Sequence, residues 1–215
     1  KNKIKNITNF LNSYKFSIPR LIIYNQIEDG NVEFSVNINF NDNSQKKITY
    51  DAKGKISEGR LNVFDNIKIK DINFNFYIKD NKYDFKKASF NYQDLKFNSK
   101  EILIKKFNKT FEIEGDVESN KGPIDRNTIS KIFNINLDVL ENKKILAKTS
   151  NKFKFIINAK RELKNLDLVS KIDFKEILIN KKIQNLISFQ DGFININYKK
   201  NFLNIDIDSG YSFIK

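Results

Sequence analysis

From Val32 to Phe40 apolar and polar residues alternate without a break, and the alternation returns, less perfectly, almost to the C-terminus. A period of two residues predicts half-buried β-strands, because successive side chains of a strand point to opposite faces. Such strands build a sheet with one polar face and one apolar face. The function of the chain therefore depends on what covers the apolar face.

The strand signals follow one another closely, which predicts an elongated antiparallel meander. Connecting stretches such as Asn41–Ser44 and Lys79–Lys82 have the composition and length of hairpin turns, so neighbouring strands should pair in sequence order. The predicted strands are Arg20–Tyr24, Val32–Phe40, Lys47–Ile56, Arg60–Ile69, Ile72–Ile78, Tyr83–Tyr92, Ile102–Phe107, Thr110–Val117, Lys152–Ala159, Leu166–Phe174, Glu176–Ile179, Phe193–Tyr198 and Phe202–Ile207.

One or two short helices are expected beside these strands. Apolar residues from Ile4 to Tyr14 recur at helical spacing before Pro19. The segment Asp125–Phe133, just after Gly122-Pro123, shows the same spacing, with Asp125 or Asn127 placed to cap a helix.

The pattern divides one elongated unit into three parts. We expect a β-meander with an N-terminal helix over residues 1–120, a Gly-Pro turn and short helix over 121–140, and continuing strands over 141–215. The segments Asp71–Phe85 and Asp191–Ile205 also resemble each other at an offset of 120 residues. Each has the pattern of one hairpin, so the chain is a candidate for an internal structural repeat.

The composition removes most enzyme chemistry. The chain has no Cys and no His, which excludes thiolate nucleophiles, imidazole bases, their metal sites and disulfides. Paired carboxylates remain at Asp206 and Asp208 and at Glu112 and Glu114, but both pairs fall on the polar register of an amphipathic strand. We therefore predict a protein that is not an enzyme, with no catalytic residues, no metal site and no cofactor.

The formal net charge of +13 allows three interpretations. Lysines on turns and sheet edges keep a β-protein soluble, and this interpretation is the simplest. Diffuse attraction to an anionic membrane surface is the second, at about 1 kcal/mol for each nearby lysine. Nucleic acid is the least favoured, because basic residues come in pairs, such as Lys46-Lys47, and acidic residues are interleaved among them.

No apolar run approaches the roughly 18 residues that a membrane-spanning helix needs; Leu21–Ile23 and Phe155–Ile157 are among the longest. The chain also lacks a Met at position 1. We expect it to be an excised segment of a longer protein, whose targeting signals can lie outside these residues.

An exposed apolar sheet face is costly, at about 25 cal/mol per Å². A second sheet can cover it in a sandwich, closure can cover it in a barrel, or a hydrophobic ligand can cover it in an open groove. The alternation alone leaves these three alternatives open.

Several segments resemble the strand ladder of the AsmA-like superfamily, the YhdP- and TamB-type proteins of the bacterial envelope. These segments are Tyr50–Ile56, Ile67–Ile78, Ala88–Tyr92 and Phe111–Gly115. A Gly-Pro turn and short helix between strand sets is similar to Lys121–Ile124 leading into Ser130–Phe133, and a further strand set, Phe153–Leu168, follows. The resemblance spans residues 30 to 207.

The resemblance implies a curved, taco-like β-groove in a periplasmic protein, anchored to the inner membrane by a segment outside this chain. It implies lipid transport: phospholipid or another acyl lipid would pass along the groove between the inner and outer membranes, and other envelope proteins would be partners. The candidate lining residues lie on the apolar register of the clearest strands: Phe34, Val36, Ile38, Phe74, Phe76, Phe90, Tyr92, Ile113, Phe155, Ile157, Ile194 and Ile196. The alternative function is a structural or adhesive β-sandwich or solenoid of the cell envelope without a lipid ligand.

Overall fold

A computed structural model describes residues 2–3, 27–40, 48–63, 67–92, 95–127, 138, 140–141, 144–158, 162–180 and 186–214. Nearly all of these residues lie in strands. The strands are β1 (Asn2–Lys3), β2 (Ile27–Phe40), β3 (Ile48–Val63), β4 (Ile67–Lys79), β5 (Lys82–Tyr92), β6 (Leu95–Phe107), β7 (Thr110–Ser119), β8 (Gly122–Asp125), β9 (Lys144–Ile157), β10 (Leu163–Asn180), β11 (Leu186–Lys199) and β12 (Phe202–Ile214).

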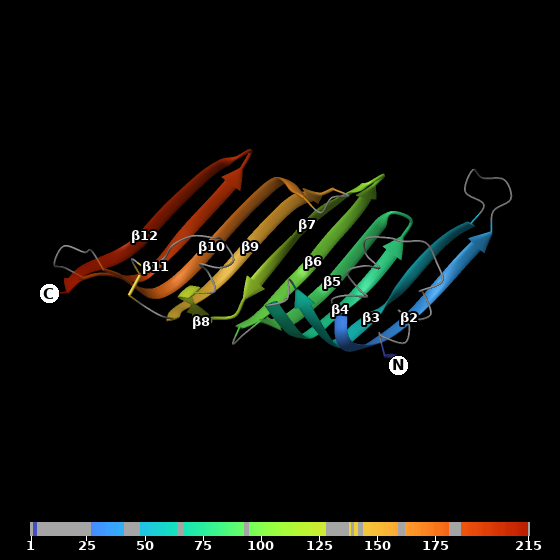
Figure 1. Cartoon of the computed structure of the whole chain (residues 1–215), viewed down its shortest axis with the longest axis horizontal. Coiled ribbons are helices and arrows are strands. Elements are labelled where there is room, and N and C mark those ends of the chain that lie inside the picture. Colours follow the sequence, from blue (N-terminus) through green and yellow to red (C-terminus); the bar gives the residue numbers. More distant parts are fainter. Residues whose placement is uncertain are drawn as a thin grey trace.

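The strands form one open antiparallel sheet. From β1 to β7, and again from β9 to β12, each strand pairs with the next one in the sequence, and β9 joins the two sets by pairing with β7. Only β8 lies off this path, against the first residues of β9. Figure 1 shows the strands crossing a long sheet that does not close on itself. The predicted antiparallel meander is therefore confirmed.

The described residues contain strand where parts of the predicted helix and turn segments were expected. Asn2–Lys3 form strand β1 where the N-terminal helix was expected, and the rest of that helix lies outside the described residues. The predicted Gly-Pro turn is wrong, because Gly122–Asp125 pair with β9 as β8. Arg126 and Asn127 do begin a helical turn, and the side chain of Asp125 accepts a hydrogen bond from the backbone N–H of Asn127 as an N-cap does. Residues 128–137, with the rest of that helix, are outside the described part.

Two strand boundaries were also predicted wrongly. Arg60–Ile69 is not one strand, because it spans the end of β3 and the start of β4. Conversely, Leu166–Phe174 and Glu176–Ile179 are parts of the single strand β10. The predicted strand Arg20–Tyr24 lies outside the described residues.

Irregular residues inside the strands explain such errors. Glu58, Asp71 and Lys87 have φ angles of 56°, 52° and 53°, and Asp191 has a φ of 46°. The register shifts at the first three of these residues in the pairings of β3 with β4 and of β4 with β5, and it shifts at Asp191 between β11 and β12. An extra residue of this kind breaks the alternation and bends the strand. A strand with one bulge therefore looks like two strands in the sequence.

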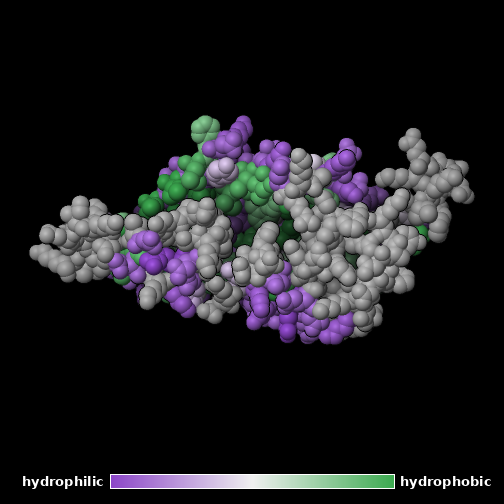
Figure 2. Space-filling model, viewed as in Figure 1, coloured by the Kyte–Doolittle hydropathy of each residue, from purple (hydrophilic) through white to green (hydrophobic). Residues whose placement is uncertain are grey.

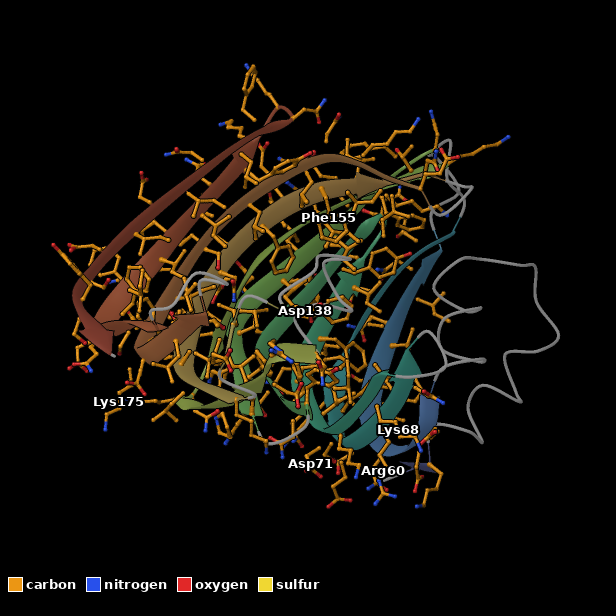
Figure 3. All side chains as sticks on the ribbon, turned by 60° about the vertical axis from the view of Figure 1, so that its left-hand side comes forward. Arg60, Lys68, Asp71, Asp138, Phe155 and Lys175 are labelled. Carbon is orange, nitrogen blue, oxygen red and sulfur yellow. The ribbon has the colours of Figure 1, made fainter. Side chains whose placement is uncertain are left out.

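Three of these bulges line up across β3, β4 and β5 and form a crease. Glu58, Asp71 and Lys87 come from adjacent strands, and their neighbours pair with one another, as Gly59 does with Ile72. At this level the sheet curls upward along one long edge, as Figure 3 shows near Arg60, Lys68 and Asp71. The sheet is therefore a trough whose long axis runs across the strands.

The two segments of the suspected repeat have a similar local structure. Both are hairpins, β4 with β5 and β11 with β12, and each begins at a left-handed aspartate, Asp71 or Asp191. The second hairpin turns at Lys200 and Asn201, which both have positive φ, as in a type I′ turn.

Buried apolar residues are few among the described residues, and their main cluster lies on β9 and β10. The main cluster is Ile145, Ala147 and Phe174, and Ile124 of β8 and Leu140 pack against it. Two interactions hold Leu140 in this position. It forms an isolated antiparallel β-bridge with Ile179, and its backbone carbonyl accepts a hydrogen bond from the side chain of Arg126. The larger part of the apolar face has no second layer of described residues over it.

Candidate functional site

The pairing register assigns each side chain to one face of the sheet, because directly opposite residues of antiparallel strands point to the same side. Phe155 points into the hollow of the trough in Figure 3, so the face that it shares is the concave one. Ile113 lies opposite Phe155, and Ile104 lies opposite Ile113. Apolar residues thus continue from strand to strand on the concave face.

One row of residues on this face runs from β2 to β12 without a charged or amide side chain. We call it the central row. Its members, from β2 to β12, are Phe34, Gly54, Phe76, Phe85, Ile102, Gly115, Phe153, Leu168, Tyr198 and Leu203. At about 4.8 Å between strands, the row is about 40 Å long. Figure 2 shows apolar residues gathered in a central hollow with hydrophilic residues along its borders.

The crease preserves the apolar face instead of interrupting it. Phe85 lies in the central row on the concave face. With strict alternation along β5, Phe90 and Tyr92 would point to the convex face. Lys87 adds one residue and shifts the alternation, and Ser89 then lies opposite Asn73 on the polar face. Phe90 therefore returns to the concave face, where its ring stacks on Phe97 at 5.1 Å.

All the candidate lining residues lie on the concave face. Those on β2 are the most exposed, with Phe34 at 48%, Val36 at 44% and Ile38 at 55%. The others are half-buried between neighbouring side chains: Phe74, Phe76, Phe90, Tyr92, Ile113, Phe155, Ile157, Ile194 and Ile196. None of them is fully buried, as the residues of a sandwich core would be.

Sequence reasoning missed the glycines of the central row. A Cβ on Gly54 would lie 2.7 Å from the ring of Phe76 and 2.8 Å from the Cα of Phe34. The glycine therefore lets the ring of Phe76 approach the backbone of β3 closely. The signal was available in the sequence, because Gly54 and Gly115 both fall on the apolar register of their strands.

A small polar cluster interrupts the concave face beside the central row. It consists of Ser119, Thr149, Asn151 and Ser170 from β7, β9 and β10. The Ser170 hydroxyl donates to Asn151 Oδ1 at 2.6 Å, and the Thr149 amide donates to Ser119 Oγ at 2.8 Å. These groups bond to one another, so the cluster is a satisfied polar spot on an apolar floor.

The convex face of β6, β7 and β9 carries charged side chains that form ion pairs with one another. Lys105 and Lys154 each lie within 4 Å of both Glu112 and Glu114, at 3.2 to 3.8 Å. Hydrogen bonding to Lys105 lowers the pKa of Glu114, and hydrogen bonding to Glu112 raises the pKa of Lys154. The paired carboxylates Glu112 and Glu114 are thus bound to lysines on a water-facing surface.

The other carboxylate pair lies on the same face at the edge of the sheet. Asp206 and Asp208 of β12 lie opposite Asn195 and Phe193 of β11. A hollow of about 470 Å³ on this face, over β6, β7, β9 and β10, is lined by Glu101, Asp116, Lys152, Asp167 and neighbouring residues. Leu103 and Val169 line it as well, so this hollow is mixed in character. The concave face carries an uninterrupted apolar row from β2 to β12 and is the better candidate site.

Comparisons with protein-family models, with curated proteins and with solved structures found no match to this chain. Within the residues that the structure describes, no helix has the length and apolar character required to cross a bilayer. Nor do the described residues include a group of three or more acidic side chains arranged to hold a metal ion.

Proposed function

We propose that the concave face binds the acyl chains of a phospholipid or another acyl lipid, and that the chain is a lipid-transport segment of AsmA-like type. The observation that carries this proposal is the central row, an apolar surface about 40 Å long on the open side of a curved sheet. Large contiguous apolar surfaces on a protein mark binding sites. An aliphatic ligand would remove this face from water.

The shape of the trough favours a lipid over a compact ligand. The hydrocarbon core of a bilayer is about 30 Å thick and holds two acyl chains end to end, so one chain is shorter than the central row. A trough that is open along its length would leave a headgroup in water while the acyl chains lie on Phe76, Phe153 and their neighbours. This arrangement needs no catalysis.

The cellular setting follows from the sequence resemblance. We propose a periplasmic location, anchoring to the inner membrane by a segment outside these residues, and movement of lipid towards the outer membrane. The net charge of +13 supports contact with an anionic membrane surface at either end of the path.

The first experiment is to purify the 215-residue chain from bacteria, extract it with organic solvent and identify bound lipid by mass spectrometry. We expect phospholipid at a defined molar ratio to the protein. A folded chain that carries no lipid would contradict the proposal and favour a structural or adhesive module.

Paired substitutions on opposite faces make the test specific. Phe76→Asp places a charge in the central row, whereas Tyr77→Asp places the same charge on the convex face of the same strand, where Tyr77 is 42% exposed. Ile196→Asp and Asn197→Asp form a second pair on β11. We expect the concave variants to lose most of the bound lipid and the convex variants to keep it, with circular dichroism confirming that all four are folded.

A different outcome would assign another role to the apolar face. If Phe76→Asp and Ile196→Asp unfold while their convex partners do not, the face is a closed core in solution. If all four variants keep the same amount of lipid, the lipid binds elsewhere.

A further inference from the structure

Hairpin turns gather along one long edge of the sheet. They join β4 to β5, β6 to β7, β9 to β10 and β11 to β12, and Figure 1 shows them along the upper edge. The first two turns lie side by side, because the Lys106 amide donates a hydrogen bond to the carbonyl of Asn81 at 2.8 Å. We call this edge the turn rim. Its described turn residues are 79–82, 106–110, 162–164 and 199–202.

Lysines of the turn rim carry charge that the sheet does not balance. Lys79 lies directly opposite Lys82 across the first turn, Lys109 lies in the second, and Lys199 and Lys200 lie in the last. All five are exposed, and among the described residues none of them is in an ion pair. Like charges that face each other across a hairpin are unfavourable. An anionic surface beside the rim would relieve this repulsion.

Acidic residues on the rim are few by comparison. Asp80 and Glu162 are the acidic residues in the described turns, and Glu162 lies 3.9 Å from Lys164. Within the sheet, in contrast, lysines such as Lys105 and Lys154 are paired with glutamates. Unpaired positive charge is therefore a property of the rim, and not of the described lysines in general.

Two phenylalanines of the turn rim stand on the polar register. Phe202 lies opposite Lys199, one residue from Tyr198 of the central row, so it belongs to the convex face. Phe107 lies opposite Thr110 and belongs to the same face. Phe202 is 81% exposed and Phe107 is 56% exposed. A ligand on the concave face does not account for either of them.

A convex phenylalanine in the interior of the sheet is covered, unlike these two. Phe193 is half-buried, and the ammonium group of Lys171 lies 4.7 Å from the centre of its ring. Among the described residues no cation lies over Phe107 or Phe202 in this way. Each of these two rings is instead exposed at a turn that also carries exposed lysine.

We infer that the turn rim binds the surface of a bilayer that contains anionic phospholipid. The lysines would lie beside lipid phosphates, and Phe107 and Phe202 would enter the boundary between headgroups and acyl chains. Apolar side chains flanked by lysine let a protein lie on a membrane without crossing it. The inference goes beyond lipid binding on the concave face and does not depend on it.

The spacing of the two rings favours a bilayer over nucleic acid. Phe107 and Phe202 belong to β6 and β12, which are five strand spacings apart in the sheet. At about 4.8 Å for each spacing, this is about 24 Å. Aromatic side chains that bind a nucleic acid strand stack on successive bases, which are much closer together. A bilayer surface reaches both rings at once.

The inference is tested with the whole 215-residue chain and vesicles of equal parts phosphatidylcholine and phosphatidylglycerol. Co-sedimentation measures binding, and vesicles of phosphatidylcholine alone are the comparison. We expect binding to the mixed vesicles to be tighter by at least about ten-fold and to weaken as salt is added.

Two variants with the same change in net charge locate the contact. Replacing the five rim lysines by glutamine should weaken binding to the mixed vesicles by at least about 100-fold, because each lysine near the surface contributes about five-fold. These lysines are Lys79, Lys82, Lys109, Lys199 and Lys200. The control variant replaces five exposed lysines away from the rim and should weaken binding by less than about five-fold. Its substituted residues are Lys68, Lys70, Lys96, Lys121 and Lys175.

The same variants separate the rim from the concave face. None of the substituted lysines lies in the central row, so both variants should keep any lipid that is purified with the chain. Loss of vesicle binding without loss of that lipid is the result expected for two independent sites. Circular dichroism checks that both variants are folded.

Fluorescence tests the role of the two phenylalanines. The chain has no tryptophan, so a single introduced tryptophan reports on its own surroundings. Emission of Phe107→Trp and of Phe202→Trp should shift to shorter wavelength when mixed vesicles are added, because the indole leaves water. Val169→Trp, on the convex face of β10 at a residue that is 55% exposed, should show no shift.

Other outcomes would overturn the inference. Equal loss of binding in the two glutamine variants would mean a diffuse effect of net charge. Binding without a shift at Phe107→Trp and Phe202→Trp would place the contact on another surface. Failure of the folded chain to bind mixed vesicles would remove the membrane contact, and displacement from the vesicles by a single-stranded oligonucleotide that shifts both tryptophans would assign the rim to nucleic acid.

Discussion

Single residues in left-handed conformation shape this molecule. Glu58, Asp71, Lys87 and Asp191 have positive φ inside strands, where only glycine avoids a steric cost of about 1 to 2 kcal/mol. Aspartate tolerates this conformation better than most residues, but lysine and glutamate do not share that advantage. These residues are retained at a cost because each one shifts the alternation where the sheet bends.

Lys87→Gly should stabilise the folded chain by about 1 kcal/mol, because glycine adopts the left-handed conformation freely. Lys87→Ile should destabilise it, since a β-branched side chain is the least tolerant of positive φ. The control is Lys53→Gly on the exposed polar face of β3, where glycine should cost about 0.5 to 1 kcal/mol. Urea denaturation measures all three, and a loss of stability in Lys87→Gly would show that the left-handed conformation of Lys87 is not strained.

The close packing around Gly192 leads to a second prediction, about the stability of a substituted chain. A Cβ there would lie 2.5 Å from the carbonyl oxygen of Asp208 and 2.7 Å from the ring of Phe174. Gly192→Ala should therefore destabilise the chain by about 2 kcal/mol through overpacking. Gly210→Ala, whose nearest neighbour would be the carbonyl oxygen of Gln190 at 3.6 Å, should change stability by less than about 0.5 kcal/mol. Equal effects in denaturation experiments would contradict this close packing.

At the scale of elements, the two faces of each strand are stabilised differently. The concave face gains from apolar contacts such as the edge-to-face pair of Phe74 and Phe85, whose ring centres are 5.2 Å apart. The convex face of β6, β7 and β9 is joined by lysine and glutamate, which alternate across the strands. The exposed pairs contribute little individually, and their role is to fix which strands are neighbours.

The ion pairs of β7 give the fold a pH dependence with a definite sign. The pKa of Glu114 is lowered from its ordinary 4.5 by hydrogen bonding to Lys105. Its stabilising effect is therefore complete above pH 4.5 and is lost as the pH falls through the lowered value. The raised pKa of Lys154 acts at the other end, since its effect is lost only as the pH rises above 10.5.

Glu114→Gln should accordingly lower the denaturation midpoint at neutral pH and have no effect in strong acid. The loss should stay below about 1 kcal/mol, because 35% of the Glu114 side chain is exposed. Urea denaturation of both proteins from about pH 2 to pH 8 measures the difference. A difference that persists at about pH 2, where both proteins carry a neutral side chain at this position, would assign the effect to packing instead of charge.

At the scale of the whole molecule, the sheet is a one-layer array in which each strand is stabilised mainly by its two neighbours. In such arrays stability is close to a sum of local terms, as in repeat proteins. The central strands β5, β6, β7 and β9 have paired neighbours on both sides, whereas β12 has one and is the most exposed. Local opening should therefore be easiest at the edges.

Amide hydrogen exchange of the free chain should show protection that rises from β2 and β12 towards β6 and β7. The physical reason is that an edge strand opens by losing one set of pairings, while a central strand must lose two. Uniform protection along the sheet would contradict this expectation and indicate that the array unfolds as a single cooperative unit.

Much of the strand content could be predicted from the sequence, because the alternation that specifies a half-buried strand is local. The candidate lining residues were found in the same way, and all of them lie on one face. The bulges could not be predicted, because Glu58 and Lys87 have no local signal for positive φ. The alternation therefore ends β3 too early and assigns Arg60–Ile69 to one strand. The continuation of β10 through Lys175 is not predicted either, because the apolar positions change there from Ile172 and Phe174 to Ile177 and Ile179.

The sequence by itself determined that this protein is a sheet with one apolar and one polar face, because side-chain alternation is a property of each strand alone. Only the tertiary structure decided that the described sheet is open and that the central row is continuous from Phe34 to Leu203. These properties depend on register and on left-handed residues in line across strands, which are relations between segments far apart in the chain.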